Sequence, residues 1–79
     1  MSFKVEFTNI VVKDGYIYAD AYDFDFNIGT KIKLSTTKPE YYINGEPEDF
    51  GRIVVGFWAL QDRIKESGTL NSREAVVWF

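Results

Sequence analysis

The sequence predicts an α+β fold: a mainly antiparallel β-sheet in the order β-β-β-(β)-α-β, with one amphipathic helix packed on one face. Two patterns predict it. Apolar and charged residues alternate with a period of two over residues 3–8, 22–26 and 31–34, as in strands with one buried face. Apolar residues then recur at helical spacing between residues 50 and 64. A chain of 79 residues has room for one core, so we expect a single domain over residues 1–79.

The first hairpin is predicted to turn at Asp14-Gly15, because glycine tolerates the positive φ that a tight turn demands. Counting back from this turn without interruption places Phe7 opposite Tyr22. The next pair on the same face is Val5 and Phe24. We therefore expect the large apolar side chains of both strands on one face of the sheet and the charged side chains on the other.

The second hairpin is predicted to turn at Asn27-Ile28-Gly29, with Gly29 as the left-handed residue of the loop. This register pairs Tyr22 with Leu34 on the apolar face. On the other face it sets Asp23 beside Lys33. Such exposed ion pairs contribute only about 0.5 kcal/mol each, so they indicate the register rather than the stability.

A short strand over residues 40–43 and a last strand over residues 75–79 complete the predicted sheet. The short strand follows a loop at residues 35–39, where Pro39 cannot donate to a central ladder. The last strand is apolar on both faces, which is typical of a strand that is buried on both sides or completes a sheet. Its position in the sheet stays open.

The helix is predicted to begin near Pro47, since proline, Glu48 and Asp49 suit a first helical turn. Gly68 is a natural left-handed residue for its end. Gly56 lies at the flank of the apolar stripe, where we expect a close approach to the sheet. The stripe itself consists of Phe50, Ile53, Val54, Phe57, Leu60 and Ile64.

The composition excludes several kinds of chemistry. The chain has no cysteine and no histidine, which excludes disulfides, thiolate catalysis and Cys/His zinc sites. A net charge of −3, with the aromatic residues lying among acids, does not favour direct nucleic-acid binding. We find no apolar run that could span a bilayer and expect no signal peptide, so we expect a cytoplasmic protein that does not bind membranes.

The carboxylates offer little for catalysis. Asp23, Asp25 and Asn27 match part of a calcium loop, but Gly29 stands one place late and no bidentate carboxylate follows. Asp20 has the parity of the apolar face, where a polar partner or the wet edge of the sheet would hold it. We expect no catalytic residue, no metal site and no cofactor; a small enzyme that uses Asp20 and tyrosines is an alternative.

A surplus of apolar surface is the feature that indicates a function. The first hairpin is apolar on both faces near its turn, and one helix can cover only one of them. We therefore predict a protein interface there and on the flank of the helix, with core packing as the alternative. The predicted interface consists of Ile10, Val12, Tyr16, Ile17, Ala19, Val55 and Trp58.

In size, mild acidity and α+β layout the chain resembles small phage or mobile-element inhibitors, including anti-CRISPR proteins. The surplus of apolar surface, beside the missing catalytic chemistry, predicts a small non-enzymatic protein-binding module that acts by occlusion, and the resemblance implies that it inhibits its partner protein. An acidic patch of Glu40, Glu46, Glu48 and Asp49 indicates that the partner is a nucleic-acid-binding protein with a basic groove. A homodimer or larger homo-oligomer, formed through the apolar patch or a sheet edge, is the alternative.

Overall fold

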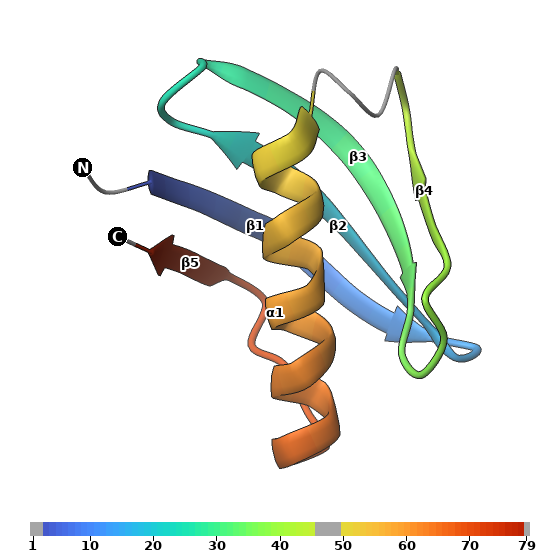
Figure 1. Cartoon of the computed structure of the whole chain (residues 1–79). Coiled ribbons are helices and arrows are strands. Elements are labelled where there is room, and N and C mark those ends of the chain that lie inside the picture. The colour runs from blue at the N-terminus through green and yellow to red at the C-terminus, as the bar shows by residue number, and fades with distance from the viewer. Residues whose placement is uncertain (1–2, 46–49, 79) are drawn as a thin grey trace.

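Five antiparallel strands form one sheet in the order β4-β3-β2-β1-β5 (Figure 1). The computed structural model describes residues 3–45 and 50–78. The elements are β1 (Phe3–Lys13), β2 (Tyr16–Asp23), β3 (Ile28–Ser35), β4 (Tyr41–Ile43), α1 (Gly51–Ser67) and β5 (Glu74–Trp78). The predicted α+β fold class, with one helix on a mainly antiparallel sheet, is therefore confirmed. The last strand, whose position the sequence left open, pairs with β1.

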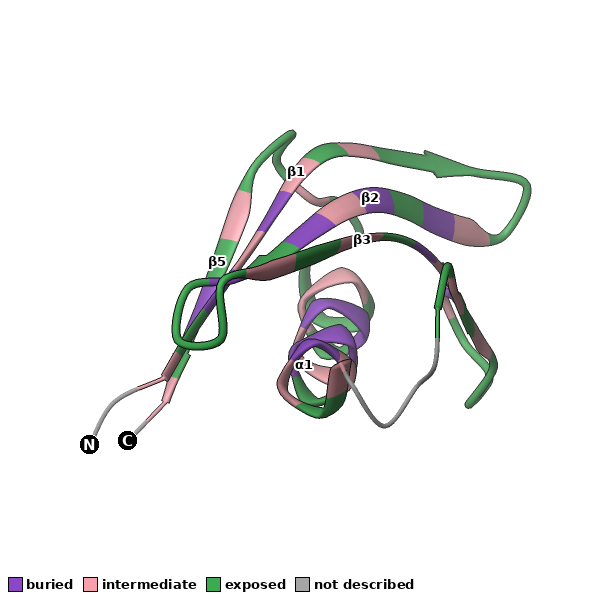
Figure 2. Cartoon of the chain, turned by 90° about the horizontal axis from the view of Figure 1, so that it is seen from above, coloured by how far each residue is buried: buried purple, intermediate pink, exposed green. Residues whose placement is uncertain are grey.

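Helix α1 lies against the inner face of the sheet, and the strands curve around it (Figure 2). One cluster of buried apolar side chains fills the space between helix and sheet. The face that is turned away from α1 is called the outer face below. The buried cluster consists of Val5, Phe7, Ile17, Ala19, Ala21, Ile32, Leu34, Ile53, Phe57, Leu60 and Val76.

Strand β1 contains a bulge at Asn9 and Ile10 that the predicted register lacks. Near the turn the pairing with β2 is as predicted, but beyond the bulge Phe7 pairs with Ala21 rather than with Tyr22. Asn9 has a φ of 53°, in the left-handed region that asparagine tolerates better than most residues. One extra residue in β1 thus shifts the register of everything before it.

This shift exchanges the two faces of β2, because side chains alternate along a strand. Tyr22, Phe24 and Phe26, which were predicted to pack on the apolar face, are 37%, 50% and 60% exposed. Asp23, predicted on the charged surface, is 1% exposed. The predicted division into an apolar and a charged face is therefore wrong for β2 and for the loop that follows it.

Asp23 closes the loop between β2 and β3. Its Oδ1 accepts hydrogen bonds from the backbone N–H groups of Asp25 at 2.9 Å and of Phe26 at 3.3 Å. The left-handed residue of this loop is Asn27, with a φ of 58°, and not Gly29 as predicted. A carboxylate that accepts two backbone hydrogen bonds holds a turn in place, so the resemblance to a calcium loop has a structural explanation.

The register of the second hairpin also differs from the prediction. Leu34 pairs with Ile17, and Ile32 with Ala19. On the outer face, Lys33 pairs with Tyr18 rather than lying beside Asp23. Both corrections follow from the position of the loop, which spans residues 24–27 instead of 27–29, so that β3 starts at Ile28.

Helix α1 agrees with its predicted pattern over the described residues. Gly68 has a φ of 80° and its N–H donates to the carbonyl of Ile64, so it ends the helix as predicted. A Cβ atom on Gly56 would lie 2.9 Å from Cζ of Phe7, which confirms the close approach to the sheet. The predicted helix start at Pro47, Glu48 and Asp49 lies outside the described residues.

Two polar side chains of α1 fix the helix to the sheet. Gln61 is buried and donates to the carbonyls of Ser35 and Lys38, both at 2.8 Å. Arg63 lies 2.9 Å from Oε1 of Glu74 and also donates to the carbonyl of Ala75 at 2.9 Å. These contacts attach the end of β3, the loop before β4 and the start of β5 to one helix.

Candidate binding surface

The outer face of the sheet carries a row of large side chains near the β1–β2 turn. In the cross-strand register Val11 pairs with Tyr18, Tyr18 with Lys33, and Lys33 with Tyr42. Opposite residues on neighbouring strands share a face, so the four side chains form one line across β1, β2, β3 and β4. Val11, Tyr18 and Tyr42 are 53%, 37% and 56% exposed. We call these four residues the aromatic row.

The ammonium group of Lys33 lies among tyrosine rings. Its Nζ is 4.3 Å from the ring centroid of Tyr16, and 5.6 Å from those of Tyr18 and Tyr42. A cation over an aromatic face is attracted by the ring quadrupole, at about 0.5–1 kcal/mol for an exposed pair. These contacts hold the ammonium group of Lys33 between the tyrosine rings, in the middle of the aromatic row.

The next row along the outer face is polar and internally paired. Thr8, Asp20 and Lys31 stand opposite one another on β1, β2 and β3. Asp20 accepts a hydrogen bond from Nδ2 of Asn9 at 2.8 Å and lies 3.2 Å from Nζ of Lys31. The polar partners of Asp20 are therefore Asn9 and Lys31, and Asn9 lies at the bulge rather than directly opposite Asp20.

The hydrogen bond from Asn9 and then the one from Lys31 lower the pKa of Asp20 below its ordinary value. A general acid needs the opposite shift, so Asp20 is poorly suited to donate a proton near neutral pH. The lowered pKa also has a consequence for stability. The contribution of Asp20 is fully present above the pKa of the unfolded chain and is lost as the pH falls through the lower pKa of the folded state.

We expect the N9A and K31Q variants each to raise the pKa of Asp20 toward the ordinary aspartate range, because each removes a donor to the carboxylate. The measurement is an NMR titration of the Asp20 carboxyl carbon in wild type and both variants. Asp14, an exposed residue in the first turn, serves as the reference carboxyl. An Asp20 pKa that is equal in all three proteins would contradict this account of the network.

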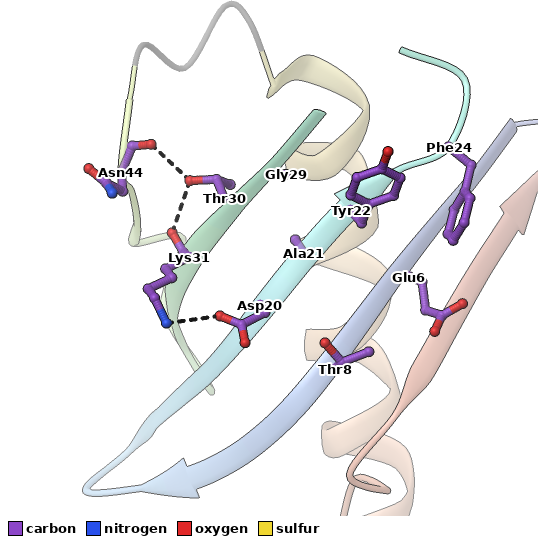
Figure 3. A pocket seen from close by; sticks show the side chains of 10 residues that line it. All are labelled: Glu6, Thr8, Asp20, Ala21, Tyr22, Phe24, Gly29, Thr30, Lys31 and Asn44. Atoms are coloured by element: carbon purple, nitrogen blue, oxygen red, sulfur yellow. Dashed lines mark hydrogen bonds and ion pairs between the residues drawn. The ribbon is translucent and has the colours of Figure 1, made fainter. Parts of the chain in front are cut away.

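A groove of about 470 Å³ lies on the outer face beyond the polar row (Figure 3). Its aromatic wall is Tyr22 and Phe24, whose rings meet edge to face with centroids 4.9 Å apart. Its carboxylates are already paired, since Glu6 lies 3.0 Å from Arg73 and Asp20 is bonded to Lys31. The lining residues are Glu6, Thr8, Asp20, Ala21, Tyr22, Phe24, Gly29, Thr30, Lys31 and Asn44.

A second, smaller hollow of about 250 Å³ includes Asn9, Tyr18 and Lys31 among its lining residues. Both hollows share Asp20 and Lys31, so they join the groove to the aromatic row. The outer face is therefore one continuous, corrugated surface and not a set of separate sites. Exposed rings lie at both ends of it, and paired charges lie between them.

The structure separates the residues of the predicted hairpin interface. Ile17 and Ala19 are 0% and 6% exposed and belong to the core, so the prediction of a surface patch is wrong for both. The bulge explains the error, because it places them on the face that α1 covers. Ile10 is half-buried against the core, and Val12 lies on the inner side of the sheet but beyond the helix, where it is exposed. Tyr16 stays on the outer face beside Lys33.

The remaining predicted residues lie elsewhere. Val55 is exposed on α1, whereas Trp58 is half-buried and packs edge to face on Tyr41 with ring centroids 5.6 Å apart. Glu40 is exposed in the loop before β4. The other members of the acidic patch, Glu46, Glu48 and Asp49, lie outside the described residues.

Sequence reasoning missed four outer-face residues. It assigned Tyr22 and Phe24 to the apolar face and Lys33 to a solvated charge pair, and it gave Tyr42 no role beyond the short strand. One signal could have found them. Asn9 interrupts the alternation of β1 with a residue that strands disfavour and that tolerates a left-handed φ. With a bulge at Asn9, Ala19, Ala21 and Asp23 face inward. Tyr18 and Tyr22 then lie on the outer face.

Among residues 3–45 and 50–78, no group of three or more acidic side chains is placed to hold a metal ion. Over the same residues, no helix has both the length and the hydropathy to cross a bilayer.

The fold and this surface define a small α+β protein with an open, aromatic sheet face. Comparisons add no family to that description: the chain matches no protein-family model, no curated protein and no solved structure.

Proposed function

We propose that this chain is a small protein-binding module that docks through the outer face of its sheet. The observation that carries the proposal is the exposure of large apolar side chains there. Val11, Tyr18, Tyr22, Phe24 and Tyr42 are all exposed on a face that no element of the described chain covers. Tyrosine supplies rigid, amphipathic contact area with little loss of conformational entropy, which suits it to anchor an interface.

A module of this kind acts by occlusion. The outer face spans a five-stranded sheet. A partner protein that binds to this face has the matching part of its own surface covered, so its other ligands cannot reach that part. This mode needs no catalytic group, in keeping with a carboxylate network that is paired and has a lowered pKa at Asp20. An inhibitor of the phage or mobile-element kind, working on a cytoplasmic protein, fits this mode of action.

A self-associating role is the second candidate, and strand β5 favours it. This edge strand is apolar from Ala75 to Trp78, and Val77 is exposed. An apolar edge without proline or lysine is a template for pairing with another copy. Light scattering at several concentrations separates the candidates, since a monomer at all concentrations excludes pairing through β5.

We expect a Y18S/Y42S double variant to lose its partner while keeping its fold. Truncating an anchor residue costs about 2 kcal/mol or more, so the affinity for the partner should fall about a thousandfold if the two costs add. The measurement is quantitative capture from nuclease-treated lysate, with circular dichroism to verify the fold. The V55S variant removes a similarly exposed side chain from α1 and serves as the control. Binding that survives in Y18S/Y42S but fails in V55S would move the interface to the helix and contradict the proposal.

A further inference from the structure

We infer that Lys33 and the tyrosines around it form a subsite for a carboxylate side chain of the partner, so that the outer face recognises an acidic segment flanked by apolar residues. This inference rests on the proposed function and adds the chemistry of the partner. It begins from a difference between two lysines on the same strand and the same face.

Lys31 and Lys33 are two residues apart on β3, but only one has a carboxylate. Lys31 lies 3.2 Å from Oδ1 of Asp20. Lys33 makes no ion pair with any acid of residues 3–45 or 50–78, and its ammonium is held among Tyr16, Tyr18 and Tyr42 instead. The structure thus places a cation on the outer face among three tyrosine rings, with no counter-ion from the described part of the chain.

The charge of the outer face is opposite to that of the whole protein. Its strands present four lysines, Lys4, Lys13, Lys31 and Lys33, against two acids, Glu6 and Asp20. Four minus two leaves an excess of two positive charges, on a chain whose net charge is −3. Both acids are neutralised locally: Glu6 lies 3.0 Å from Arg73 and 3.8 Å from Lys4, and Asp20 lies 3.2 Å from Lys31. The excess lies toward the β1–β2 turn, where Lys13 stands opposite Tyr16 beside the aromatic row.

An acidic side chain between two apolar ones matches this arrangement. The apolar neighbours would pack on Val11, Tyr18 and Tyr42, which excludes water from around Lys33. An ion pair gains strength as water leaves, and a charge-assisted hydrogen bond is stronger than a neutral one. A single carboxylate therefore supplies specificity, and the rings supply contact area.

Single-stranded nucleic acid is the rival occupant, because aromatic rings and lysines on a sheet face can bind it. The structure favours the acidic protein segment. A nucleic-acid strand brings one negative charge per nucleotide and needs a basic track along its length, whereas the charges between the aromatic row and the groove are already paired. The single ammonium group of Lys33, enclosed by tyrosine rings, matches a single carboxylate of the partner.

The test is a selection of displayed random peptides on four proteins: wild type, K33Q, K38Q and Y18S/Y42S. The K38Q variant removes an equal charge from the exposed loop before β4, away from the hollows of the outer face, and is the matched control. We expect wild type and K38Q to recover peptides with Asp or Glu between apolar residues. K33Q should lose this preference, and it should bind a peptide recovered on wild type about tenfold more weakly or worse.

A second measurement places the contact. The Hε–Cε signals of Lys33 and Lys31 are followed by NMR as a recovered peptide is added, and only those of Lys33 should move strongly. Equal recovery of acidic peptides by wild type and K33Q would overturn the inference, as would recovery of basic peptides or Lys33-dependent binding of a labelled oligothymidine. Peptides that need Tyr18 and Tyr42 but show no acidic preference would overturn it while leaving the proposed function in place. A wild-type protein that recovers no peptide dependent on Tyr18 and Tyr42 would overturn both.

Discussion

Replacing Ile17 by lysine is expected to unfold the protein. Ile17 has no exposed surface and lies in the middle of the core, between its partners Val12 on β1 and Leu34 on β3. Loss of a buried isoleucine costs about 2–5 kcal/mol, and an ammonium group without a counter-ion in that place adds several more. A small domain is stable by about 5–10 kcal/mol, so the substitution removes most or all of that margin.

Val12 offers a matched control, because it stands directly opposite Ile17 and is 45% exposed. We expect V12K to fold and to unfold cooperatively on heating, while I17K shows no cooperative transition and a disordered far-ultraviolet spectrum. The pair tests which face of the hairpin is core. A folded I17K protein with the melting temperature of wild type would mean that the helix does not cover Ile17 and that the register of β1 and β2 is wrong.

Replacing Gly56 by valine is expected to destabilise the protein by about 2–3 kcal/mol. A Cβ atom at this position would lie 2.9 Å from Cζ and 3.1 Å from Cε2 of Phe7, whose ring is fully buried. The ring has no free space into which to move, because it packs on Phe57 with centroids 5.7 Å apart. The two further methyl groups of valine would have to push α1 away from β1.

The control is the same substitution at Gly51, in the first turn of α1, where a Cβ atom would meet nothing within 4 Å. We expect G51V to change the free energy of unfolding by less than about 0.5 kcal/mol, since glycine and valine are both weak helix formers. Denaturant titrations of both variants give the comparison. Equal stabilities for G56V and G51V would show that α1 does not approach the sheet at Phe7.

The sequence allowed the elements to be predicted but not which way β2 faces. The first turn, the helix with its end at Gly68, the short fourth strand and the last strand all follow from local patterns, and all are present. The orientation of β2 depends on one extra residue at Asn9, and alternation alone cannot distinguish a strand from the same strand shifted by one. Ala19 and Asp23 were therefore expected outside and Tyr22 and Phe24 inside, which is the reverse of the structure.

The prediction of the candidate surface failed for the same reason, because it also depended on the bulge at Asn9. Tyr16 was identified from the sequence, but Lys33 and Tyr42 were not, because their meeting requires the pairing of β3 with both neighbours. The loop at residues 24–27 decides the first of these pairings through two hydrogen bonds to Asp23. Side chain–backbone bonds of this kind leave little trace in the hydropathy pattern, and so the register of the second hairpin could not be read from it.

The position of β5 next to β1 also determines when the protein can acquire its fold during synthesis. Strand β1 is made first, but its pairing with β5 joins Phe3 to Trp78, the most distant partners in the described chain. Contacts between residues so far apart form slowly, and until then β1 has β2 on one side and an open edge on the other. The growing chain therefore carries an unpaired strand edge on the ribosome until β5 emerges, which exposes it to pairing with other nascent chains.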